Sequence, residues 1–217
     1  TCIQVATNRL PCQSGEVRLF GEPVTRLAAV RRAPKVGVVT QELSTPMAFT
    51  VGEMVMMGRT AWLGRWTAPA AHYHAAVAEA MEMTDTQELA TRAFPSLSAG
   101  ERQRVAVAMA LAGEPRLLLL DEATAHLDLA HRMEIVRLIR RISAARQLAV
   151  VAVVHDLNLA AEYFPRLVLL AEGRVAVDGS PGAVLDPALL QRVYGCEVTV
   201  QRDPLANCLR VFPRFRE

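Results

Sequence analysis

Lysine is almost absent from this chain of 217 residues: Lys35 is the only one, and all other Lys/Arg positions are arginine. Aromatic residues are also scarce at 5%, although 52% of the residues are hydrophobic, so the apolar residues are mainly aliphatic. That composition suits a parallel sheet buried beneath helices. The formal net charge of +2 leaves no large basic surface, so we expect a balanced globular protein of the cytosol and no nucleic-acid partner.

The four cysteines offer no metal or disulfide framework. They lie near the two ends, at positions 2, 12, 196 and 208, and no pair has the Cys-x-x-Cys spacing, so we expect reduced thiols. No apolar run approaches the roughly 20 residues that span a bilayer, and no basic-then-apolar leader is present. We therefore expect a chain that does not cross a membrane by itself. It begins with Thr1 rather than Met, which indicates processing or truncation.

Apolar runs of strand length alternate with stretches of helical spacing. Strands are predicted at 16–21, 35–40, 117–120, 148–154, 167–170 and 174–177 and near Val198, and helices at 50–57, 70–83, 101–112, 127–145, 157–163 and 187–194. Thr50 and Glu53 have the spacing of a capping box, and Asp186 precedes the last helix as its cap. In the middle of the chain the predicted strands and helices alternate, which is typical of a parallel α/β core with right-handed crossovers. Ligands of such cores bind beyond the carboxyl ends of the strands.

Two carboxylates, Asp121 and Glu122, directly follow the wholly apolar run Leu117–Leu120. At a strand tip, Asp121 suits a water-mediated hold on Mg²⁺, which prefers oxygen ligands and keeps several waters. Glu122 can polarise an attacking water as a general base. The alternative is an ordinary acidic strand end that caps the next helix.

Three further positions can contact phosphate or water. The helix after Gly100 has free backbone N–H groups at its start, so Ser98 and Gly100 can contact an anion there, although a plain serine cap is the alternative. His155 follows the run 148–154 and can hydrogen-bond a terminal phosphate, whereas a lone histidine at a strand end is more often structural. Gln41 can orient water or Mg²⁺ through its amide, but a lone glutamine is a weaker signal.

Five motifs, taken in this order, resemble those of the ABC transporter ATPase family: 39–41 (VTQ), 97–104 (LSAGERQR), 117–124 (LLLLDEAT), 127–128 (LD) and 154–156 (VHD). The resemblance covers nearly the whole chain. The motif at 97–104, followed at this distance by the motif at 117–124, is highly specific for the family. The resemblance implies an α/β fold with a P-loop NTPase-like parallel sheet core, a small antiparallel β part and an inserted helical subdomain. It also implies ATP and Mg²⁺ as ligands.

By this resemblance, Asp121 matches the Walker B aspartate, which holds Mg²⁺. Gln41 matches the Q-loop glutamine, which contacts Mg²⁺ and orients the attacking water. Glu122 matches the catalytic glutamate and His155 the switch histidine. Ala123 stands where the family usually has proline, which removes no functional side chain.

The resemblance further implies that the signature residues contact ATP held by an opposite subunit. Ser98, Ala99, Gly100 and Glu101 form that signature, and Asp128 is the D-loop aspartate. Ala99 departs from the usual glycine. Function in this family therefore implies a head-to-tail dimer with a second ATPase subunit.

One part of the family pattern is missing from the printed sequence. The family needs a Walker A loop, Gly-x-x-Gly-x-Gly-Lys-[Ser/Thr], and Lys35 lies in no such setting. Aligning residues 13–17 with the segment that follows the family's first helix puts Thr1 just after the loop. We expect an N-terminally truncated ATPase that does not bind ATP in its own site. The alternative is a degenerate, non-hydrolysing partner subunit. The presence of Glu122 and His155 disfavours it, because such a subunit would have no role for these side chains.

Other segments resemble the importer branch that handles iron-siderophore, haem and cobalamin; they are 57–65, 124–129, 155–160, 172–174, 179–181 and 190–195. In that branch the segment from Thr50 to about Ala90 forms a helical lobe that docks on a permease. We therefore expect a single domain over 1–217, with an α/β core at 1–49 and 96–217 and a helical subdomain at 50–95.

These expectations describe an ATP-hydrolysing importer subunit, peripheral to the cytoplasmic face of a bacterial-type inner membrane. Its partners would be a second ATPase subunit, an integral-membrane permease and, indirectly, a substrate-binding protein. An ABC ATPase of another importer class is the alternative. A DNA-repair ATPase would need a long coiled-coil insertion between Gln41 and Leu97, and a translation factor would need two ATPase halves.

Overall fold

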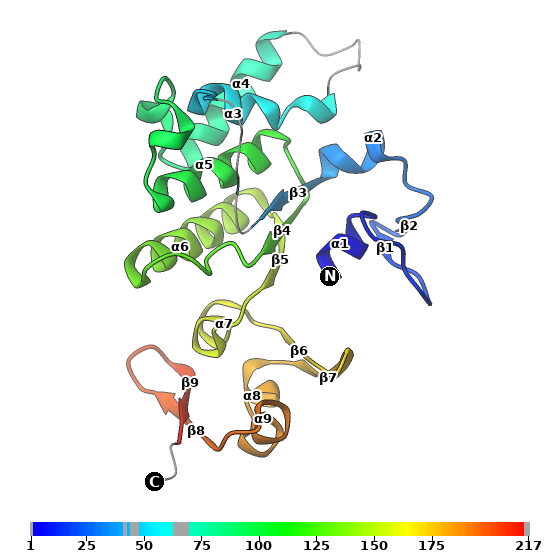
Figure 1. The fold of residues 1–217 in the computed structure, drawn as a ribbon, viewed down its shortest axis with the longest axis vertical. Helices are drawn as coiled ribbons and strands as arrows, with labels where there is room; N and C mark the ends of the chain where they lie inside the picture. The colour runs from blue at the N-terminus through cyan, green and yellow to red at the C-terminus, as the bar shows by residue number, and fades with distance from the viewer. Residues whose placement is uncertain (1, 41–42, 44–47, 63–69, 215–217) are drawn as a thin grey trace. The chain divides into compact units, whose positions relative to one another are not determined.

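The computed structural model describes residues 2–40, 43, 48–62 and 70–214. The chain forms two compact units, residues 1–153 and 154–217, and each is described by itself. Figure 1 labels the elements of both units.

A three-stranded parallel sheet organises the first unit. Its order is β3 (Val36–Val39), β4 (Leu117–Asp121), β5 (Ala149–Val153), which confirms the predicted parallel α/β core. The central strand β4 is buried on both faces, as its uniform leucines predict. Leu118 and Leu120 pack into the larger core cluster and Leu119 into a second cluster, because successive side chains of a strand point to opposite faces. Val151 of β5, at the edge of this sheet, is 53% exposed.

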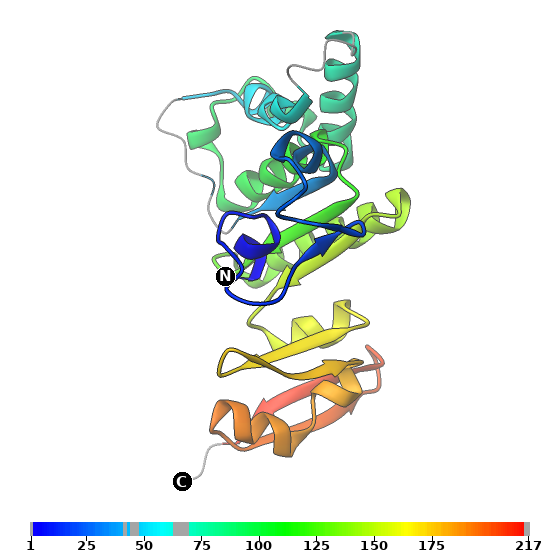
Figure 2. The ribbon, with the colours of Figure 1, turned by 90° about the vertical axis from the view of Figure 1, so that its right-hand side faces the viewer.

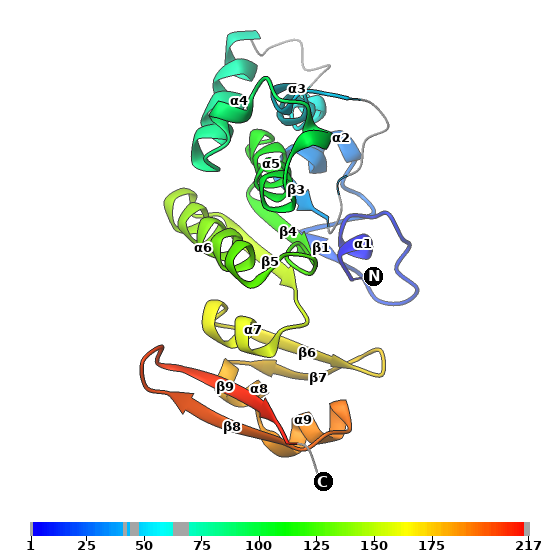
Figure 3. The same ribbon diagram turned by 60° about the vertical axis from the view of Figure 1, so that its left-hand side comes forward.

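Helices α5 (Ala99–Ala112) and α6 (Leu129–Arg146) contribute seven and four buried residues to the larger core cluster. Helix α5 also packs against α3 (Val51–Met57) and α4 (Ala70–Met83), as Figure 3 shows. The N-cap of α3 is confirmed: Glu53 N–H donates to Thr50 Oγ1 over 3.3 Å, and Thr50 N–H donates to the Glu53 carboxylate over 2.8 Å. Short 3-10 turns at Thr60–Trp62, Gln87–Leu89 and Phe94–Ser96 join these helices.

The remaining elements of this unit are short. Helix α1 (Cys2–Ala6) supplies Ile3 to the second core cluster. The hairpin of β1 (Arg18–Leu19) and β2 (Glu22–Pro23) supplies Leu19, and Val24 follows directly after β2. The predicted strand at 16–21 is therefore only two residues long, since the chain turns back at Phe20–Gly21, both of which have positive φ. Helix α2 (Ala29–Arg32) and a 3-10 turn (Ala33–Lys35) lead into β3.

In its described residues, 154–214, the second unit contains two antiparallel hairpins and three helices. Figure 2 shows this unit in yellow to red. The pairs are β6 (Leu167–Ala171) with β7 (Arg174–Gly179), and β8 (Val198–Asp203) with β9 (Cys208–Pro213). The helices are α7 (Leu157–Tyr163), α8 (Pro181–Val184) and α9 (Pro187–Tyr194). Asp186 caps α9 through Leu189 N–H, as predicted, whereas α8 and β9 were not predicted.

Within the described parts of the chain, no helix combines the length and the apolar character that crossing a bilayer requires.

Candidate functional site

The site begins at the edge of the sheet where the three parallel strands end together. Val39 pairs with Leu120 and Asp121 with Val153, so Thr40, Asp121 and the end of β5 lie at the same edge. Ligands of open α/β sheets bind beyond this carboxyl edge. Gln41, the next residue after Thr40, lies outside the described residues.

Asp121 and Thr40 both line one cavity of about 340 Å³. Gln4, Thr7 and Arg9, from α1 and the turn after it, line the same cavity. The cavity thus joins one carboxylate, hydroxyls and a guanidinium, the mixture of groups that can serve both a hydrated cation and an anion.

Glu122 marks a sharp turn at the tip of β4. Its φ is 53°, in the left-handed region that a non-glycine residue adopts at a cost of roughly 1 kcal/mol. Its N–H still donates to Val153 O over 3.3 Å, so the ladder between β4 and β5 extends to this residue. The carboxylate side chain is half-buried. Such strained backbone is found at many functional sites, and here it stands immediately after Asp121.

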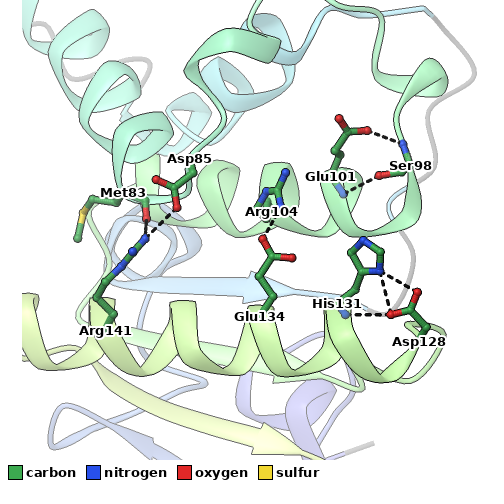
Figure 4. Close-up of polar contacts among 9 residues, drawn as sticks. All are labelled: Met83, Asp85, Ser98, Glu101, Arg104, Asp128, His131, Glu134 and Arg141. Carbon is green, nitrogen blue, oxygen red and sulfur yellow. Dashed lines mark hydrogen bonds and ion pairs between the residues drawn. The ribbon is translucent and has the colours of Figure 1, made fainter.

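The N-terminus of α5 is built by a second capping box, shown in Figure 4. Glu101 N–H donates to Ser98 Oγ over 3.2 Å, and Ser98 N–H donates to Glu101 Oε2 over 2.7 Å. The Ser98 hydroxyl has a single proton, so it can accept from Glu101 N–H and donate either to the Glu101 carboxylate or to a phosphate. The N–H groups of Ala99 and Gly100 belong to the first turn, where an α-helix supplies no internal acceptor. An anion is favoured at this position.

Hydrogen bonds within this capping box favour the ionised form of the Glu101 carboxyl. Hydrogen bonds from the backbone and side chain of Ser98 lower the pKa of Glu101, and the positive charges of Arg92 and Arg104 lower it further. Arg92 Nη1 lies 3.2 Å from Glu101 Oε1. Glu101 is therefore an anion at neutral pH and is already engaged in the cap, which makes it a structural part of the site.

Asp128 is the N-cap of α6. Its Oδ1 accepts from His131 N–H over 2.9 Å, and its Oδ2 lies 2.8 Å from His131 Nδ1. These hydrogen bonds, the backbone one first, lower the pKa of Asp128 below its usual range. Figure 4 shows this pair below the first turn of α5. The structure thus brings two of the predicted in-trans residues, Gly100 and Asp128, to one side of the first unit, with His131 between them.

His155 belongs to the second unit, where it is exposed and precedes the N-cap of α7. That cap is Asp156, whose Oδ1 accepts from Asn158 N–H over 2.9 Å and from Leu159 N–H over 3.0 Å. The predicted role of His155 as a phosphate contact stays a prediction.

Sequence reasoning missed three residues of this region: Thr40, Arg9 and His131. Thr40 and Arg9 contribute to the cavity through chain folding that no local pattern reveals. His131 had a local signal, since an N-cap aspartate and a residue three positions later adjoin at the start of a helix. Its approach to Gly100, 31 positions earlier, had none.

The fit of Mg²⁺ and nucleotide phosphate can be judged from these groups. Among the described residues, no three His, Cys, Asp or Glu side chains gather so as to hold a metal ion. Mg²⁺ is commonly held by one or two carboxylates together with waters and substrate phosphates, so Asp121 beside a cavity of about 340 Å³ suits it. The capped start of α5 suits a phosphate.

Comparison with known proteins agrees with this chemistry. The family described as ABC transporter matches residues 1–125. The hemin import ATP-binding protein HmuV of Myxococcus xanthus is 43% identical over an alignment that covers 100% of this chain and 82% of that protein. The ferric enterobactin transport ATP-binding protein FepC of Escherichia coli is 32% identical and is matched over 80% of its length by 100% of this chain.

Among solved structures, one described as an inward-facing conformation of a metal-chelate type ABC transporter has a TM-score of 0.77 and 27% identity. The match covers 84% of this chain and 73% of that chain. It confirms the α/β fold class. From the family match and from these identities over nearly the whole chain, this chain belongs to the ABC transporter ATP-binding family, whose members bind nucleotide and couple ATP hydrolysis to transport.

Proposed function

We propose that this chain is the ATP-hydrolysing subunit of an importer for a metal chelate of the siderophore-iron, haem or cobalamin class. ATP hydrolysis is supported by two adjacent carboxylates at the edge of the sheet. Asp121 lines the cavity, and Glu122 follows it in a left-handed turn. The substrate class is supported by the names of the relatives, which import hemin and ferric enterobactin.

The roles within the site follow from side-chain chemistry. Asp121, with Gln41, would hold Mg²⁺, which when bound neutralises charge on the transferred phosphate. Glu122 accepts a proton from the attacking water, since a half-buried carboxylate at a strand tip is well placed to act as a base. His155 donates a hydrogen bond to the terminal phosphate.

A second set of residues would act on nucleotide held by another subunit. Ser98, Ala99, Gly100 and Glu101 present the first turn of α5, and Asp128 lies beside that turn at the start of α6. Ser98 is exposed and Asp128 has a side chain that is 65% exposed, as a surface offered to a partner requires. The proposed assembly is a head-to-tail dimer with two composite sites.

The proposed membrane partner is an integral permease, indirectly served by a substrate-binding protein. Residues 50–95 form the docking lobe, and residues 1–49 and 96–217 form the α/β core. Docking would make this subunit peripheral to the cytoplasmic face of the inner membrane.

Transport by a reconstituted complex tests this function. The full-length protein would be reconstituted in lipid vesicles with the permease that co-purifies with it, and uptake of hemin, a ferric siderophore and cobalamin would be measured with and without MgATP. We expect ATP-dependent accumulation of one of the three. Hydrolysis without uptake of any of them would contradict the substrate class, and a complex without ATP hydrolysis would contradict the enzymatic assignment.

A further inference from the structure

His131 lies between the first turns of α5 and α6, as Figure 4 shows. Its Nδ1 is 2.8 Å from Asp128 Oδ2 and 2.9 Å from Asp128 Oδ1. The opposite edge of the ring faces α5: a Cβ added to Gly100 would lie 2.3 Å from His131 Cδ2 and 3.1 Å from Nε2. One imidazole therefore touches both the carboxylate of Asp128 and the backbone at Gly100.

The hydrogen bond to Asp128 fixes the orientation of both groups. An ionised carboxylate only accepts hydrogen bonds, so His131 Nδ1 must carry the proton and donate. The lowered pKa of Asp128 keeps the carboxylate ionised at neutral pH. Because Asp128 Oδ1 also accepts from His131 N–H, the carboxylate is held from two directions.

The contact with Gly100 leaves no room for a Cβ at this position while the His131 ring stays in place. Heavy atoms as close as 2.3 Å overlap, so an alanine here would push the ring away from α5. Gly100 itself is buried, whereas the side chain of His131 remains 43% exposed. The ring thus sets the spacing between the start of α5 and the carboxylate of Asp128.

We propose that His131 is a positioning residue for ATP hydrolysis, which holds Asp128 at a fixed place beside the signature turn of α5. The inference rests on the proposed function, in which both elements act on nucleotide held by the partner. His131 acts through Asp128 and Gly100.

Variants of the full-length protein test this role by steady-state ATP hydrolysis. His131→Ala removes both contacts, so we expect kcat to fall about tenfold, since loss of orientation in a site costs rate more than binding, with KM for ATP changed less than about threefold. His131→Asn retains an N–H donor within reach of Asp128 and should recover most of the rate. His74→Ala, the same exchange at an exposed position of α4, should leave kcat unchanged.

Pairing the change with Gly100→Ala tests the contact itself. If the ring is what excludes a methyl group, Gly100→Ala alone loses activity, whereas Gly100→Ala with His131→Ala is no less active than His131→Ala alone. If the fold-losses in kcat of the two single variants multiply in the double variant, the two residues act independently, because independent sites combine additively in free energy. That result would overturn the proposed coupling between the ring and Gly100.

The outcomes separate this inference from the proposed function. An unchanged kcat in His131→Ala, or an equal loss in His131→Asn, would overturn the positioning role while Glu122→Gln still abolishes hydrolysis. Undiminished hydrolysis in Glu122→Gln would instead overturn the proposed function.

Discussion

Ser98 and Thr50 cap two helices of the first unit with the same pair of hydrogen bonds, yet only Ser98 is proposed to face ATP. Replacing either by alanine removes the cap of one helix, and we expect each variant to lose about 1 kcal/mol in the free energy of unfolding. Only Ser98→Ala should also reduce ATP hydrolysis, because only this hydroxyl is proposed as a phosphate donor. Urea unfolding and phosphate release, measured on both variants, check the prediction; equal rates of hydrolysis would contradict it.

Glu101 links the stability of α5 to pH. Hydrogen bonds from Ser98 lower the pKa of its carboxyl from 4.5, so the folded state favours the ionised form. The stabilisation is fully present above pH 4.5 and is lost as the pH falls through the lowered folded pKa. We expect the unfolding free energy of the wild type to exceed that of Glu101→Gln at neutral pH, with a difference that shrinks below pH 4.5.

Urea titrations over a pH series measure this difference. Glu82→Gln, at an exposed position of α4, is the matched control and should show no comparable trend. A difference between wild type and Glu101→Gln that stays constant down to pH 3 would rule out the linkage to Glu101.

Close packing of α3 against α5 requires glycine at position 58, the C-cap of α3. A Cβ at this position would lie 1.9 Å from Met109 O of α5, so the two helices could not approach as they do. We expect Gly58→Ala to lower the free energy of unfolding by about 2 kcal/mol or more, as overpacking does. Gly182→Ala in α8, where the nearest atom is 4.0 Å away, should change it little. Similar unfolding midpoints for the two variants would contradict this account of the packing.

The same helices show which features of an element can be predicted from local sequence. The box at Thr50 was predicted from the spacing of Thr50 and Glu53. At Ser98, for which only a plain serine cap was considered, Glu101 completes a second box with the same spacing. The uniform leucines of β4 likewise predicted burial on both faces. Hairpin β8–β9 was only half predicted, because the charged residue Arg210 interrupts the short apolar run of β9. Arg210 on that strand pairs with Glu162 of α7, a contact 48 positions apart.

At the scale of the whole molecule, the order of motifs predicted the family, and the matched residues 1–125 and the relatives confirm it. The composition of the candidate site was only partly predictable. Asp121 and Glu122 stand together in the sequence, whereas Thr40 and Arg9 line the same cavity as Asp121 through chain folding. His131 is brought to Gly100 by the packing of α5 on α6, which no single segment encodes.

Glu122 is proposed as the base of an ATPase, and the rate of phosphate release from MgATP tests this role most directly. In the full-length protein, Glu122→Gln keeps the shape of the side chain and removes the base. We expect it to bind nucleotide as the wild type does and to release phosphate at least about a hundredfold more slowly, whereas Glu82→Gln hydrolyses at the wild-type rate. Undiminished phosphate release from Glu122→Gln would contradict the central claim.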